Sequence, residues 1–117
     1  MKKRPYIKLS VRRNVLARFG GRCGYCGHLS NYLEIDHVEP FFSNFNKDDE
    51  SNYMAACKPC NRFKSGMRLE EFRSELSKQA KRAIEYSVNA RTAFRFGKIS
   101  LNPVEDIAFY FEKRVKK

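Results

Sequence analysis

The sequence lacks any stretch of apolar residues long enough to cross a membrane. A membrane-spanning helix needs about 18 or more consecutive apolar residues, and no run in these 117 residues reaches that length. The charged start at residues 1–5 is not followed by the apolar core of a secretory signal. These two absences predict a cytoplasmic protein without a membrane partner.

Acidic residues are scarce relative to basic ones. Lys and Arg number 24 against 13 Asp and Glu, which gives a formal net charge of +11. A chain this basic is attracted to a polyanion, and nucleic acid is the first candidate because each neutralised phosphate releases counterions. A basic protein that only binds nucleic acid or a ribosome, without any chemistry, has the same charge.

Cysteine is also rare, and its four copies fall into two Cys-x-x-Cys pairs, Cys23/Cys26 and Cys57/Cys60. Such pairs seldom form structural disulfides in a reducing compartment, and a redox motif requires only one pair. Two pairs in a small basic chain indicate a structural Zn²⁺ site with four thiolate ligands and no position open for catalysis. His28, just beyond the first pair, is an alternative ligand that four cysteines make unnecessary.

Hydrophobic periodicity and turn residues predict a protein of the α+β class. The long helix rests on apolar residues at helical spacing, and the last helix on Asn102 followed by Pro103, a typical helix start. The expected elements are a helix over 11–19, a strand over 32–38, a short helix over 57–64, a long helix over 69–90, an irregular stretch or short strand over 94–100, and a last helix from 102 that buries Val104, Ile107, Ala108 and Phe111.

No linker or composition change separates a second domain. We therefore expect one domain over residues 1–117. Within it, residues 1–9 form a basic arm, residues 10–66 form the zinc-stapled core, and residues 67–117 add a helical extension. The extension is expected to help grip nucleic acid or to form a dimer face.

Polar residues suited to phosphodiester hydrolysis lie between and beside the cysteine pairs. Asp36 and His37 fall on the predicted strand, and Asn61 directly follows the second pair. Hydrolysis needs an activated water and a cation near the developing charge. A carboxylate and an amide oxygen suit Mg²⁺ or Mn²⁺, and a histidine can take a proton near neutral pH.

This order of motifs resembles the HNH, or ββα-metal, endonucleases. The resemblance covers about residues 12–66 and rests on the first cysteine pair, Glu-Ile-Asp-His-Val-Glu-Pro at 34–40, Asn52, and Cys-x-x-Cys-Asn-x-x-Lys at 57–64. The chain is most similar to the four-cysteine variant found in phage nucleases, including junction-resolving ones. The resemblance implies a small ββα-metal, treble-clef-like core in a bacterial or phage-infected cell. Residues 41–45 depart from it, because many relatives have a Gly-Gly turn there.

The resemblance also implies a role for each site residue. His37 matches the general base, and Asp36 and Asn61 match the ligands of a catalytic Mg²⁺ or Mn²⁺, with Ni²⁺ as a further ion to test. Asn52 matches the asparagine that holds the intervening loop and so orients the base. Together with His37 it is therefore expected to be a catalytic residue. Glu34 and Glu39 are expected to be solvated carboxylates, with a tuning role or a metal contact as the alternative.

The predicted function is that of a metal-dependent endonuclease acting on duplex, nicked or branched DNA. Arg62 and Lys64 are expected to contact phosphates. A single HNH site cuts one strand, so both a nicking monomer and a homodimer making paired cuts are compatible with the sequence. The alternative is a non-catalytic zinc-knuckle module that binds nucleic acid. That module would not require Asp36, His37 and Asn61 to act together.

Overall fold

The structure is a computed structural model of the chain, and it describes residues 6–40, 49–102 and 107–115. The chain divides into two compact units. The sheet unit comprises Met1–Leu69 and Ala108–Lys117, and the helical unit comprises Glu70–Ile107. The elements are, in chain order, α1 (Leu9–Arg18), β1 (Leu33–His37), the 3₁₀ helix η3 (Glu50–Asn52), β2 (Tyr53–Cys57), α2 (Lys58–Lys64), α3 (Leu69–Tyr86), α4 (Val88–Arg95) and α5 (Tyr110–Val115).

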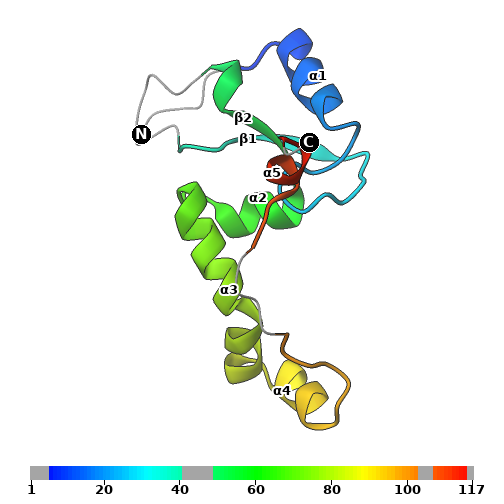
Figure 1. The fold of residues 1–117 in the computed structure, drawn as a ribbon, viewed down its shortest axis with the longest axis vertical. Coiled ribbons are helices and arrows are strands. Elements are labelled where there is room, and N and C mark those ends of the chain that lie inside the picture. Colours follow the sequence, from blue (N-terminus) through cyan, green and yellow to red (C-terminus); the bar gives the residue numbers. More distant parts are fainter. Residues whose placement is uncertain (1–5, 41–48, 103–106, 116–117) are drawn as a thin grey trace. The chain divides into compact units, whose positions relative to one another are not determined.

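The sheet unit is built on an antiparallel pair of strands, β1 and β2, and confirms the predicted α+β class (Figure 1). The register places Leu33 opposite Cys57 and His37 opposite Tyr53. All five residues of β2 are buried. Because an apolar strand buried on both faces shows no alternation, the sequence pattern did not reveal it as a strand.

Helices cover both faces of this pair of strands. Figure 1 shows α1 on one side of the sheet and α2 on the other, and each helix contacts both strands. On the inner face of α1, Val15 is completely buried. The helix begins at Leu9, two residues before the predicted start, and no side chain caps it. Gly20, at φ 61°, follows its end in the left-handed region that glycine tolerates best.

The last helix begins later than the sequence predicted. Pro103 and Val104 lie outside the described residues, and α5 starts only at Tyr110. Ala108, which was expected to be buried, is exposed, whereas Phe109 is 2% exposed. The chain therefore enters the core through Phe109, ahead of the helix.

The segment around α5 is hydrogen-bonded to the first cysteine pair. The amide of Tyr110 donates to the Tyr25 carbonyl at 2.9 Å, and the amide of Phe111 donates to the Gly24 carbonyl at 2.8 Å. The rings of Phe109 and Tyr25 also pack edge to face, with centroids 5.5 Å apart. The C-terminal segment is therefore part of the sheet unit, although it follows the whole helical unit in sequence.

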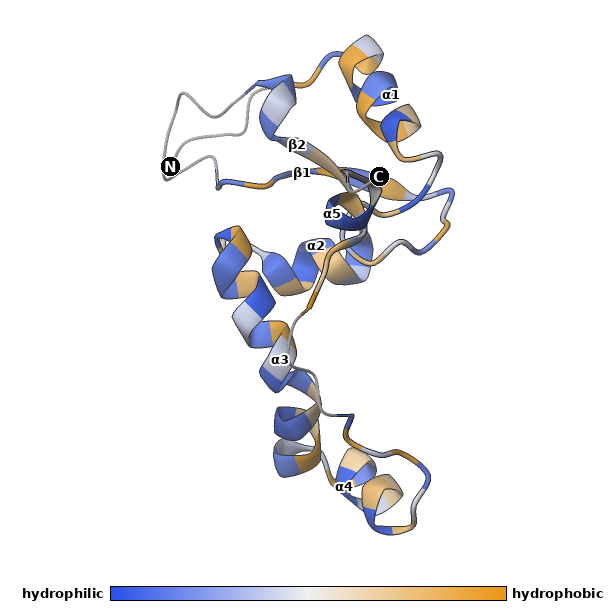
Figure 2. Cartoon of the chain, viewed as in Figure 1, coloured by the Kyte–Doolittle hydropathy of each residue, from blue (hydrophilic) through white to orange (hydrophobic). Residues whose placement is uncertain are grey.

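The helical unit consists of α4 and most of α3. The sequence predicted one helix over residues 69–90, but the helix breaks at Ser87, whose hydroxyl accepts a hydrogen bond from the Ala90 amide and so starts α4. Figure 2 shows apolar and polar residues interleaved along both helices. None of the helices in the described ranges is long and apolar enough to cross a membrane.

Candidate functional site

The four cysteines converge on one point of the sheet unit. Cys23 and Cys26 lie in the turn that precedes β1, whereas Cys57 ends β2 and Cys60 lies in α2. Their Sγ atoms all lie within 4.8 Å of one another, and those of Cys26 and Cys57 are 3.8 Å apart. Four sulfurs placed tetrahedrally at about 2.3 Å from zinc are separated by about 3.8 Å. The donor set and its spacing therefore suit a zinc-type metal.

The first cysteine pair forms a tight knuckle (residues 23–27) against β2. The Gly24 amide donates to the Ala55 carbonyl at 2.7 Å, and a Cβ at Gly24 would lie 2.1 Å from the Met54 sulfur. A side chain at position 24 would therefore require Met54 to shift. A hydrogen bond from the Cys60 thiol, aided by backbone amides, lowers the pKa of Cys23 to about 4. This stabilises a thiolate, which is the form that binds metal.

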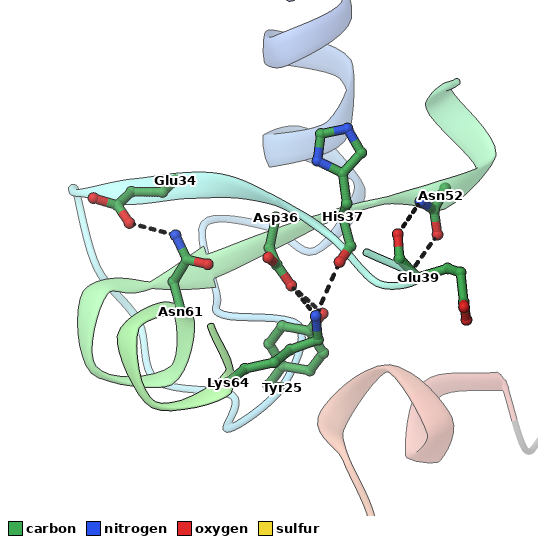
Figure 3. A network of polar contacts seen from close by, with 8 residues as sticks. All are labelled: Tyr25, Glu34, Asp36, His37, Glu39, Asn52, Asn61 and Lys64. Atoms are coloured by element: carbon green, nitrogen blue, oxygen red, sulfur yellow. Dashed lines mark hydrogen bonds and ion pairs between the residues drawn. The ribbon is translucent and has the colours of Figure 1, made fainter. Parts of the chain in front are cut away.

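Asp36 lies in a buried polar network on one side of β1 (Figure 3). Its side chain is almost fully buried, and its Oδ2 accepts a hydrogen bond from the Tyr25 hydroxyl at 2.7 Å. The Nζ of Lys64, completely buried, lies 3.0 Å from the same oxygen and also donates to the His37 carbonyl at 2.9 Å. Burial, with a further contribution from the Asp36 carboxylate, raises the pKa of Tyr25 far above its usual range. The phenol therefore remains a proton donor.

Asn61 lies on the same side of the sheet as Asp36. Glu34 and Asp36 are two residues apart on β1 and therefore share a face, and α2 lies along that face (Figure 3). The Asn61 amide nitrogen donates to a Glu34 carboxylate oxygen at 2.7 Å. Among the described residues, neither Asp36 Oδ1 nor Asn61 Oδ1 has a hydrogen-bond partner. Two hard oxygen atoms suited to Mg²⁺ or Mn²⁺ are thus left available.

His37 lies on the opposite side of β1. Figure 3 shows its ring directed away from the Asp36 carboxylate, as expected for adjacent residues of a strand. The side chain is 3% exposed, and its ring packs edge to face against Tyr53 with centroids 5.2 Å apart. The structure therefore brings Asp36 and Asn61 to one side of the sheet and places His37 on the other.

Asn52 fastens the chain where it leaves β1. Its amide exchanges two hydrogen bonds with the backbone of Glu39, donating to the carbonyl at 2.8 Å and accepting from the amide at 2.9 Å. The Val38 amide also donates to the Asn52 carbonyl at 2.9 Å. These bonds fix the two residues that follow His37. The chain beyond Pro40, including the departure from the expected Gly-Gly turn, lies outside the described residues.

The two predicted phosphate contacts have different outcomes. Arg62 is exposed on α2, and its contact with phosphate stays a prediction. The prediction for Lys64 is wrong, because that side chain is fully buried and holds Asp36 and the His37 carbonyl. Lys64 is three residues after Asn61 and lies on the same inner face of α2, whereas Arg62 is turned outward.

Sequence reasoning assigned no role to Tyr25 and expected Glu34 to be solvated. Glu34 is instead half-buried and holds Asn61, and its place two residues before Asp36 was the available signal. No local pattern marks Tyr25, because its contact with Asp36 arises only when the knuckle folds beneath β1.

Residues 21–66 match the HNH endonuclease family. This span contains both cysteine pairs, β1, β2 and α2. The fold agrees with the match, because two antiparallel strands followed by a helix, with a four-cysteine cluster, are consistent with the small ββα-metal fold of HNH proteins. No curated protein sequence matches the chain.

Proposed function

From the match of residues 21–66 to the HNH endonuclease family, we propose that the protein is a metal-dependent endonuclease that hydrolyses DNA phosphodiester bonds. The observation that carries the proposal is the pair of available oxygens on Asp36 and Asn61. Each residue is held by buried or half-buried partners that engage its other polar atom. A module that only binds nucleic acid has no need of such an arrangement.

The residues present fit a catalytic Mg²⁺ or Mn²⁺ in their donor chemistry. Asp36 supplies a carboxylate oxygen and Asn61 a neutral amide oxygen, and Mg²⁺ usually takes few protein ligands and keeps several waters. When bound there, the ion would neutralise charge that develops on the phosphate. Lys64 and Tyr25 keep the carboxylate oriented, and Glu34 keeps the amide oriented.

We assign His37 the role of general base. Hydrolysis of a phosphodiester by in-line displacement places the attacking water and the leaving oxygen on opposite sides of the phosphorus. A base and a metal on the two sides of β1 near its end are compatible with that requirement. The Lys64 bond to the His37 carbonyl and the Asn52 bonds to Glu39 hold the backbone directly after the imidazole-bearing residue.

DNA as substrate is supported by the distribution of charge between the two units. The sheet unit carries 17 Lys and Arg against 7 Asp and Glu, whereas the helical unit carries 7 against 6. The sheet unit therefore carries a net charge of about +10, whereas the helical unit is nearly neutral. We propose that DNA contacts lie on the sheet unit, with Arg62 on α2 among them, and not mainly on the helical extension.

The helical unit is better suited to pairing with a second copy of the chain. It exposes apolar side chains within a short stretch, and its near-zero net charge opposes self-association only weakly. A dimer would also bring two single-strand sites together. The exposed apolar residues are Tyr86, Val88, Phe94, Phe96, Ile99 and Leu101.

The test is cleavage of supercoiled plasmid by zinc-loaded protein with and without added Mg²⁺, Mn²⁺ or Ni²⁺. Omitting the ion is a better control than EDTA, because a chelator also removes zinc. We expect ion-dependent nicking that is strongly reduced in Asn61→Ala and unchanged in Asn31→Ala, an exposed asparagine.

Equal cleavage by Asn61→Ala and the wild type would contradict the proposed metal site. Tight DNA binding without cleavage of plasmid or branched DNA in any of the three ions would favour the non-catalytic zinc-knuckle module.

A further inference from the structure

Tyr25 lies in the zinc knuckle and also contacts the buried polar network around Asp36. It stands between two of the clustered cysteines, Cys23 and Cys26, and its side chain is 3% exposed. Its hydroxyl nevertheless reaches the Oδ2 atom of Asp36 at 2.7 Å. Figure 3 shows this contact between Tyr25 and Asp36. One side chain therefore connects the segment that carries Cys23 and Cys26 to a carboxylate on β1.

The position of the Tyr25 ring is fixed independently of Asp36. The rings of Phe109 and Phe111 pack against it edge to face, with centroids 5.5 Å and 6.3 Å away. Its carbonyl accepts the Tyr110 amide at 2.9 Å. Because the ring is held by the knuckle and by the C-terminal segment, its hydroxyl offers the carboxylate a donor at a fixed place.

This donor determines which carboxylate oxygen is available. The Tyr25 hydroxyl and the Lys64 ammonium both bind Oδ2 of Asp36, which leaves Oδ1 available. The Lys64 ammonium is shared with the His37 carbonyl, and with three equivalent donors it imposes less direction on the carboxylate than a single O–H does. A phenol has one O–H in the plane of a rigid ring. Without it, the carboxylate would be restrained only by the ammonium and could rotate.

We propose that Tyr25 is a positioning residue for the catalytic divalent ion, and that through it the zinc knuckle controls the affinity of the Asp36–Asn61 site. The inference rests on the proposed function, because it requires an ion at that site. Groups that orient metal ligands from outside the first coordination shell typically change metal affinity about 10–100-fold when they are removed.

The test is a titration of the zinc-loaded Tyr25→Phe variant with Mn²⁺. Binding is measured as the loss of the EPR signal of free Mn²⁺, and the zinc content of the same samples is measured in parallel. The substitution removes only the hydroxyl and keeps the ring between its aromatic neighbours. We expect Mn²⁺ to bind about 10–100-fold more weakly at unchanged zinc content. Tyr32→Phe, which removes the same group from a side chain that is 81% exposed, should bind Mn²⁺ like the wild type.

A second variant separates the hydroxyl from general loosening of the knuckle. Phe109→Leu keeps the phenol but removes a ring that packs against it. If Tyr25→Phe weakens Mn²⁺ binding no more than Phe109→Leu does, the effect is structural and the inference is wrong. Loss of zinc from Tyr25→Phe would also overturn the inference, because the tyrosine hydroxyl would then be needed to maintain the structural zinc site.

Asn61→Ala distinguishes failure of this inference from failure of the proposed function. If Asn61→Ala loses Mn²⁺ while Tyr25→Phe binds it like Tyr32→Phe, only the role of Tyr25 is refuted. If Asn61→Ala binds Mn²⁺ like the wild type, the proposed catalytic site is refuted, and the role of Tyr25 is refuted with it.

Discussion

Replacing Lys64 with methionine should destabilise the fold more than any other single change of a lysine on α2. The ammonium of Lys64 is completely buried, 3.0 Å from Asp36 Oδ2 and 2.9 Å from the His37 carbonyl. Methionine occupies a similar volume but donates no hydrogen bond. The substitution therefore leaves a buried carboxylate with one donor in place of two and removes a donor from a buried strand carbonyl.

The expected loss is about 3–5 kcal/mol of unfolding free energy, the range observed when one partner of a buried ion pair is removed. This is a large share of the roughly 5–15 kcal/mol that stabilises a typical domain. Removing both charges, with Asp36→Asn added to Lys64→Met, should cost less than the sum of the two single changes. A coupling of about 2–3 kcal/mol is expected for two residues in direct contact.

The assay is urea denaturation of zinc-saturated protein followed by circular dichroism. Lys58→Met is the matched control, because Lys58 lies on the same helix and is exposed, and it should change stability by no more than about 0.5 kcal/mol. If Lys64→Met and Lys58→Met unfold at the same urea concentration, the buried ion pair does not stabilise the fold.

Three further outcomes follow from the described contacts. Gly24→Ala should cost about 1–3 kcal/mol in the same denaturation assay, because the new Cβ would lie 2.1 Å from the Met54 sulfur; unchanged stability would show that Met54 moves aside freely. Cys57→Ser should lose zinc and fold incompletely, as measured by metal content and circular dichroism, and a folded, zinc-bound variant would contradict the four-thiolate site. Asn52→Ala removes both side-chain bonds to Glu39. It should slow plasmid cleavage without changing Mn²⁺ affinity, and a parallel loss of affinity would place Asn52 with the metal ligands.

Local patterns in the sequence were sufficient to predict the framework of the sheet unit. The two cysteine pairs predicted that all four thiols meet at one metal site. The structure confirms that the four sulfurs converge. The strand predicted over 32–38 contains β1, and the short helix predicted over 57–64 contains α2. β2 was not recognised because its residues are buried on both faces, so no alternation marks it. The break at Ser87 was missed because the apolar spacing continues through it.

The candidate site could be predicted only in part. Asp36, His37, Asn52 and Asn61 were identified from their order and from resemblance, but the partners that orient them were not. The bond from Tyr25 to Asp36 spans 11 residues, and the ion pair of Lys64 with the same carboxylate spans 28. Such contacts depend on how the knuckle and α2 pack on β1. Neither the composition nor the hydrophobic periodicity of the sequence predicts that packing.

The central claim is tested most directly by the rate of plasmid nicking at saturating Mg²⁺ for two histidine variants. The chain has two histidines, and His28 is exposed whereas His37 ends β1. Loss of a general base typically costs about 10²–10⁴-fold in rate. The proposed mechanism predicts a loss of that size for His37→Ala, with zinc content and DNA binding retained, and a wild-type rate for His28→Ala. Nicking by His37→Ala at the wild-type rate would contradict the mechanism.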